Sequence, residues 1–116
     1  MKAKTITVSM LFSIAAMFYA QGAMCAVDAV AAEALAKKEG CLKCHGIDKA
    51  KQAKSLTDIA KKFKGKADAD AKILAQITSG AKVKFEDGSE EEHKVIKTKD
   101  KAETANLIGW IRSLAK

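Results

Sequence analysis

The chain has 116 residues, of which 30% are charged and only 5% aromatic, and it contains no proline. This length allows one small domain and excludes a multidomain protein. Such a domain builds a modest core and usually depends on a further stabilising element, while its net charge of +7 favours acidic partners.

Residues 1–26 have the three-part pattern of a secretory signal peptide. Lys2 and Lys4 make a basic start, an apolar stretch runs from Ile6 to Ala20, and small residues follow. The apolar stretch is short for a membrane-spanning helix, which needs about 20 residues; an uncleaved N-terminal anchor is the alternative. We therefore expect cleavage after residue 26, a periplasmic (exported) protein that does not span the membrane, and a mature domain over residues 27–116.

Cleavage would change the composition in two ways. It would remove all four methionines and one of the three cysteines, leaving Cys41 and Cys44. Without Lys2 and Lys4, the 21 Lys and Arg residues become 19, against 14 Asp and Glu, so the mature polypeptide would carry +5.

The first predicted element of the mature chain is a helix over residues 27–40. Small and apolar residues recur at helical spacing and predict its inner face, while three charged residues near its end are expected to face solvent. The inner positions are 27, 30, 31, 34 and 35, and the outer ones are Lys37, Lys38 and Glu39.

The sequence Cys41-Leu42-Lys43-Cys44-His45 follows this helix. C-x-x-C-H is the attachment signature of a c-type haem: two thiols one helical turn apart bond the porphyrin's vinyl groups, and the adjacent imidazole reaches the iron. A zinc site is disfavoured because there is no second C-x-x-C or spaced histidine pair. A thioredoxin-like redox motif is disfavoured because no βαβ pattern surrounds it.

Three further helices are predicted from the apolar spacing and the helix-ending glycines. One spans residues 56–63 and ends before Gly65. The next spans about 69–79 and ends at Gly80, with Ile73, Leu74 and Ile77 on its inner face. The last begins at Asp100, which with Glu103 has the spacing of a capping box, and its inner residues are Leu107, Ile108, Trp110, Ile111 and Leu114.

A hairpin-like loop is predicted before the last helix. Asp87-Gly88 lies between the alternating runs Val83-Lys84-Phe85 and Val95-Ile96, which is typical of such a loop. Val83, Phe85 and Ile96 would then cover one face of the haem.

Taken together, residues 39–48, 58–65 and 107–114 resemble the N-terminal helix with its haem site, the next helix and the C-terminal helix of the small bacterial class I monohaem cytochromes c. The resemblance covers almost all of the mature chain. It implies an all-α fold of about four short helices around one covalent haem c with its iron, Cys41 and Cys44 as attachment points, and His45 as an axial ligand. It also implies that the last helix crosses the first, with Gly40 opposite Trp110.

Two positions depart from the family pattern. Where the family has Gly-Pro after the haem site, this chain has Ala53-Lys54; the Lys54 carbonyl can still accept the proximal imidazole's N–H, but without proline's fixed φ. The family's methionine ligand is also missing, and His93 takes its place, 17 residues before Trp110. We expect His45 and His93 to be the two iron ligands, since imidazole suits iron. The alternatives are Lys82, Lys84 or Lys94 as an amine ligand, or an open site.

The function that this resemblance implies is one-electron transfer between redox proteins, with no enzymatic activity, in a monomer that binds no nucleic acid. Two imidazoles would leave the reduction potential below that of a Met-ligated relative. The alternative is a haem-based gas or redox sensor in which His93 detaches on reduction. Lysines around the haem-bearing half predict redox partners with acidic docking surfaces: Lys37, Lys38, Lys43, Lys49, Lys51, Lys54, Lys61, Lys62 and Lys64. The segment from residue 86 to 92 has the opposite charge, with five acids.

Overall fold

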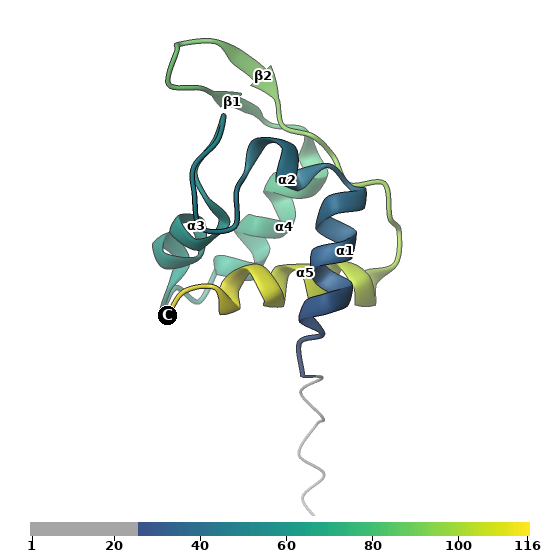
Figure 1. Cartoon of the computed structure of the whole chain (residues 1–116). Coiled ribbons are helices and arrows are strands. Elements are labelled where there is room, and N and C mark those ends of the chain that lie inside the picture. The colour runs from purple at the N-terminus through teal and green to yellow at the C-terminus, as the bar shows by residue number, and fades with distance from the viewer. Residues whose placement is uncertain (1–25) are drawn as a thin grey trace, which may run out of the picture.

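The computed structural model describes residues 26–116, so the predicted signal peptide lies outside the described residues except for its last position. The described part contains five helices and one two-stranded sheet (Figure 1): α1 (Ala29–Lys38), α2 (Cys41–Cys44), α3 (Leu56–Phe63), α4 (Ala69–Ser79), β1 (Lys82–Lys84), β2 (Glu90–Glu92) and α5 (Lys101–Ser113). The predicted helical frame is confirmed, and the small sheet is an addition to it. None of the helices in residues 26–116 has the length and apolarity needed to cross a lipid bilayer.

Helix α5 is the centre of the packing. It crosses α1, as predicted, and also packs against α3 and α4, while the β1–β2 hairpin lies at the opposite end of the molecule (Figure 1). Leu107 has no exposed surface. Its neighbours in the core come from four helices and from the segment before α5: Ala32, Leu35, Ala36, Leu56, Ile73, Ile77, Ile96, Ile108, Trp110 and Ile111. The hydrophobic core therefore lies at this end of the molecule.

The start of α5 differs in detail from a capping box. The Asp100 carboxylate accepts from the backbone N–H groups of Ala102 and Glu103 at 2.8 and 3.1 Å. The Glu103 carboxylate does not return to Asp100 but accepts from the Thr98 hydroxyl at 2.7 Å, and the Asp100 N–H donates to the same hydroxyl at 3.2 Å. Thr98 thus takes over the second half of the cap.

The predicted inner face of the first helix is wrong by about one position. Ala32, Leu35 and Ala36 are buried, whereas Val30 is 83% exposed. The buried face continues to Glu39, which was expected in solvent but is only 5% exposed. The helical spacing of small apolar residues does not predict a buried carboxylate that has backbone partners. In α4, Leu74 is likewise 42% exposed rather than inside.

The hairpin is shorter than predicted. Its strands pair Lys82 with Glu92 and Lys84 with Glu90, and Gly88 has a φ of 84° in the turn, which glycine adopts without strain. Val95-Ile96 lies outside the strands. Ile96 is buried in the core and donates its N–H to the Ile77 carbonyl at 3.0 Å, so it secures the chain after the hairpin to α4.

Candidate haem-binding site

Two half-buried free thiols begin and end helix α2. Cys41 and Cys44 are three residues apart on this single turn, so both side chains lie on one side of it. Burial raises the pKa of the Cys41 thiol, and the nearby Glu39 carboxylate acts in the same direction. Gly40, with a φ of 80°, turns the chain between α1 and α2 and so separates the thiols from the long helix.

The predicted contact of Gly40 with Trp110 stays a prediction. The nearest atoms to a Cβ at this position would belong to the Lys94 side chain, with Nζ at 2.7 Å. At Gly109 of α5, a Cβ would lie 3.0 Å from the side chain of Val27, which precedes α1.

His45 follows α2 directly and is held in one orientation by the backbone. Its main chain is extended and forms an isolated antiparallel bridge with Ala50. Its Nδ1 lies 2.6 Å from the Lys54 carbonyl oxygen, which confirms the contact predicted for Lys54. With Nδ1–H donating to this carbonyl, the lone pair of Nε2 is free to bind a metal.

The loop that presents the Lys54 carbonyl is tied at both ends. The Ala53 N–H donates to the Cys44 carbonyl at 3.0 Å, and the Leu56 N–H donates to the Gly46 carbonyl at 2.8 Å. A Cβ on Gly46 would lie closer to the Lys49 carbonyl oxygen than atoms can approach. Glycine is therefore required directly after His45.

His93 follows β2 and has the same kind of support. Its N–H donates to the Ala81 carbonyl at 2.9 Å, and its Nδ1 lies 2.9 Å from the Lys94 carbonyl oxygen. Burial lowers the pKa of the His93 imidazole, which keeps the ring neutral at pH 7. A neutral ring whose Nδ1–H is already donated presents Nε2 as a ligand.

The two imidazoles lie at a separation that suits one metal ion between them. Their ring centroids are 6.2 Å apart, with planes inclined by 43°. An imidazole nitrogen lies about 2 Å from a metal it binds, so two rings on opposite sides of one metal have centroids about 6 Å apart. The residues therefore fit an iron held between two histidines, with the two thiols beside it.

The lysine alternatives are placed differently. Lys82 and Lys84 are exposed on β1, and the Lys94 ammonium lies beside Gly40. The structure thus brings His93 to His45, which directly follows the two thiols, and leaves Lys82 and Lys84 exposed, while Lys94 lies close enough to Cys41 to act on its thiol.

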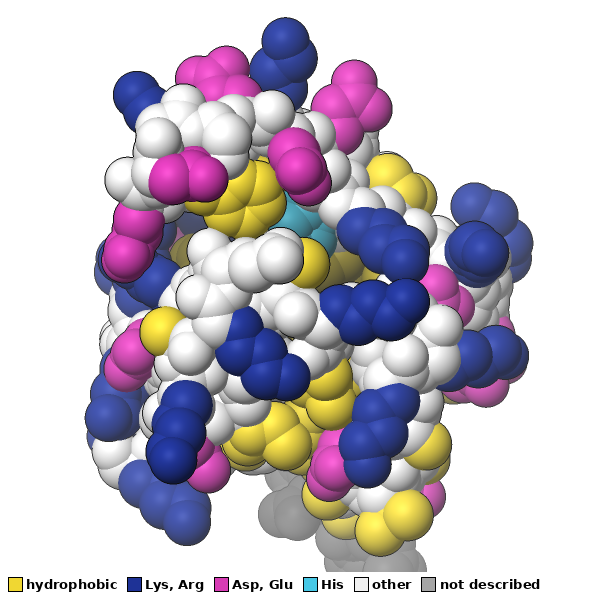
Figure 2. Space-filling model, turned by 45° about the horizontal axis from the view of Figure 1, so that its top comes forward, with side chains coloured by type: hydrophobic (Ala, Val, Ile, Leu, Met, Phe, Trp, Pro, Cys, Tyr) yellow, Lys and Arg dark blue, Asp and Glu magenta, His cyan; other side chains and the backbone are white. Residues whose placement is uncertain are grey.

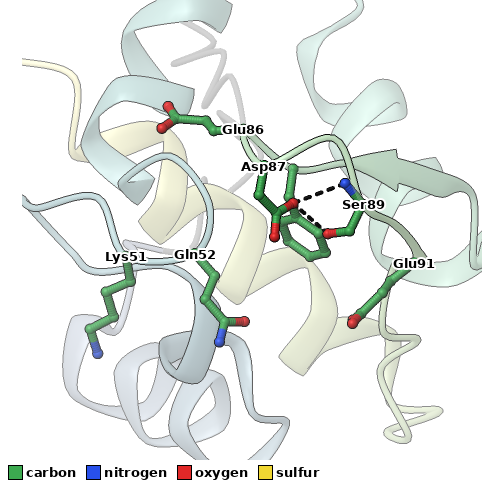
Figure 3. A pocket seen from close by; sticks show the side chains of 7 residues that line it. Lys51, Gln52, Glu86, Asp87, Ser89 and Glu91 are labelled. Carbon is green, nitrogen blue, oxygen red and sulfur yellow. Dashed lines mark hydrogen bonds between the residues drawn. The ribbon is translucent and has the colours of Figure 1, made fainter.

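A cavity opens between the loop after α2 and the hairpin. Figure 3 shows Lys51 and Gln52 on one side and Glu86, Asp87, Ser89 and Glu91 of the hairpin on the other. The cavity lies close to the thiols, because the side-chain oxygen of Gln52 is 3.5 Å from the Cys44 sulfur. Figure 2 shows a histidine side chain in the hollow beneath the acidic hairpin, with hydrophobic side chains beside it and basic ones along the facing rim.

Sequence reasoning missed three contributors to this site: the buried Glu39, the steric need for Gly46 and the contact of Gln52 with Cys44. Gly46 could have been found from the sequence, since a glycine directly after C-x-x-C-H indicates a position where a side chain does not fit. Glu39 and Gln52 had none, because their partners lie in loops whose path the pattern does not fix.

A helical domain with two thiols on one turn and two opposed imidazoles defines a protein built to hold a covalent porphyrin. The sequence model of the cytochrome c family matches residues 29–115, and the chain belongs to this family. It is a small monohaem class I cytochrome c that carries one covalent haem c, as predicted.

Relatives and solved structures agree with this assignment. The class 1 cytochrome MtoD of Sideroxydans lithotrophicus ES-1 is 50% identical, with a TM-score of 0.75 over 78% of this chain and 100% of that one. Cytochrome c552 of Nitrosomonas europaea is 28% identical, with a TM-score of 0.58 over 71% of this chain and 98% of that one. Cytochrome c2 of Rhodocyclus tenuis is 33% identical over 70% of this chain and 89% of its own length. When bound, haem c supplies a one-electron ferric/ferrous couple.

Proposed function

We propose that the protein is a periplasmic carrier of single electrons between redox proteins, with His45 and His93 as the axial ligands of its haem iron. Cys41 and Cys44 form the thioether bonds to the porphyrin. The signal peptide covers residues 1–26 and the mature domain residues 27–116. The protein is monomeric, binds no nucleic acid, and uses no residue as a catalyst.

One observation carries the proposal of two histidine ligands. Each imidazole has its Nδ1 at a backbone carbonyl, Lys54 for His45 and Lys94 for His93, and the ring centroids are 6.2 Å apart. With Nδ1–H donated to these carbonyls, each ring would present Nε2 to a metal. Two ligands held before and after electron transfer keep the site's rearrangement small, which suits a carrier better than a sensor.

The proposal of acidic partners rests on the charge around the loop after α2. Lys43, Lys49, Lys51 and Lys54 are all exposed there, and none of them belongs to an ion pair within residues 26–116. Exposed cations outside ion pairs beside a redox site attract acidic surfaces and speed up short-lived encounters.

Absorption spectra of the purified protein in both redox states, before and after adding carbon monoxide, test the proposal. We expect low-spin spectra without a sulfur-to-iron band, and no carbon monoxide complex on mixing. His93→Ala should convert the protein to a high-spin form that binds carbon monoxide at once. The matched control is His93→Gln, which keeps a polar side chain but no imidazole and should behave like the alanine variant. Rapid carbon monoxide binding by the unmodified protein would support the sensor instead.

A further inference from the structure

Glu39 is a charged side chain in a place that ordinarily excludes charge. It is 5% exposed at the end of α1, and no Lys or Arg within the described residues pairs with it. A buried carboxylate costs free energy unless hydrogen bonds replace its water. Its position therefore needs a structural reason.

The carboxylate is satisfied by two backbone donors from a distant segment. Oε2 accepts from the Lys97 N–H at 2.7 Å, and Oε1 accepts from the Thr98 N–H at 3.2 Å, across 58 and 59 residues of chain. Hydrogen bonds to an ionised acceptor are about twice as strong as neutral ones. Both oxygens are thus used to hold one short stretch of backbone.

That stretch belongs to the segment 93–100, which has no helix or strand and begins with His93. Three other hydrogen bonds join the segment to the rest of the fold. They link His93 to Ala81, just before β1, Ile96 to Ile77 of α4, and Thr98 to Glu103 of α5. The bonds of Glu39 join it instead to the α1–α2 junction, two residues before Cys41. They connect the part of the chain that holds the thiols to the part that holds His93.

We propose that Glu39 is a positioning residue for the distal iron ligand: by holding the backbone at Lys97 and Thr98, it keeps His93 at the iron. This inference rests on the proposed ligation by His93. Breaking the tether would let the segment move outward and would shorten the time for which the imidazole stays bound.

The test compares haem-loaded Glu39→Gln with Glu33→Gln. The glutamine side-chain oxygen can accept from one of the two backbone N–H groups, but its NH2 group would face the other N–H, and two donors cannot bond. Glu33 lies on the same helix and forms only a surface ion pair with Lys37, at 2.8 Å, so it receives the same change without the tether. Two quantities are measured: amide hydrogen exchange at Lys97 and Thr98, and the rate at which cyanide replaces the distal ligand of the ferric protein.

For Glu39→Gln we expect both rates to rise roughly tenfold or more, the effect of losing one charge-assisted hydrogen bond, and for Glu33→Gln we expect neither to change. Glu39→Asp, which keeps the charge on a shorter side chain, should lie between the two and serves where the glutamine variant does not fold. Faster amide exchange with an unchanged cyanide rate overturns the positioning role, as does unchanged exchange.

The His93→Ala variant separates the two proposals. If its spectrum equals that of the unmodified protein, His93 is not a ligand, and the inference about Glu39 fails with it. If its spectrum becomes high-spin while Glu39→Gln exchanges ligand at the unmodified rate, only the role of Glu39 is overturned.

Discussion

The imidazoles of His45 and His93 lie with ring centroids 6.2 Å apart, although one follows the second helix and the other follows the hairpin. Each is oriented by a backbone carbonyl, at 2.6 Å from Lys54 and 2.9 Å from Lys94. Every residue has a backbone carbonyl, so this orientation of the two rings does not require the proline of the family pattern. In place of the family's methionine, this chain has His93.

His93→Met is expected to raise the reduction potential. A thioether stabilises ferrous iron more than an imidazole does, and axial ligands together span roughly 0.8 V, so a rise on the order of 0.1 V is expected. Redox titration followed by absorbance measures it, and a sulfur-to-iron band should appear with it. His93→Lys, which supplies an amine instead, is the comparison; an unchanged potential in both variants would show that this position does not bind the iron.

Gly46→Ala should destabilise the protein, whereas Gly109→Ala should not. A methyl at Gly46 would clash with the Lys49 carbonyl oxygen, which forces the backbone to move, while a methyl at Gly109 would meet only the Val27 side chain at 3.0 Å. We expect a loss of about 1–3 kcal/mol for Gly46→Ala, and for Gly109→Ala little change or a gain of up to about 1 kcal/mol from helix propensity. Chemical denaturation of the ferric protein measures both. Equal stabilities would mean that the loop after His45 has room for a side chain.

Replacing lysines near the site should slow electron transfer to an acidic partner. The triple change of Lys43, Lys49 and Lys54 to Gln removes three exposed cations beside the thiols without removing Lys51, whose ammonium donates to the Leu42 carbonyl at 2.7 Å. We expect the second-order rate at low salt to fall about tenfold, and the difference to vanish as ionic strength rises. Stopped-flow kinetics with an acidic redox protein measures the rate.

The matched control for this charge change is the triple replacement of Lys66, Lys101 and Lys116, which are also exposed. It alters the net charge equally, but the three lysines are in the α3–α4 connection and in the C-terminal part of the chain. If both triple variants slow the reaction alike, net charge rather than local steering sets the rate.

How much could be predicted from the sequence depends on whether the determinant was local. The haem motif, the ends of α3 and α4, and Asp100 as the N-cap of α5 all depend on neighbouring residues, and they were predicted correctly. The Lys54 contact followed from the family pattern because only its carbonyl mattered. The burial of Glu39, the short hairpin and the place of Ile96 depend on contacts between distant segments, which periodicity does not encode.

Leucine burial illustrates this difference and gives the last prediction. Leu74 and Leu107 were both expected inside, yet Leu74 is 42% exposed and Leu107 fully buried at the centre of α5. Leu107→Ala leaves a cavity among four helices and should cost about 2–5 kcal/mol. Leu74→Ala should cost about 1 kcal/mol or less, as surface substitutions do. Denaturant unfolding followed by the fluorescence of Trp110, the single tryptophan, measures both; a Leu74→Ala loss as large as that of Leu107→Ala would place the outer face of α4 against another part of the protein.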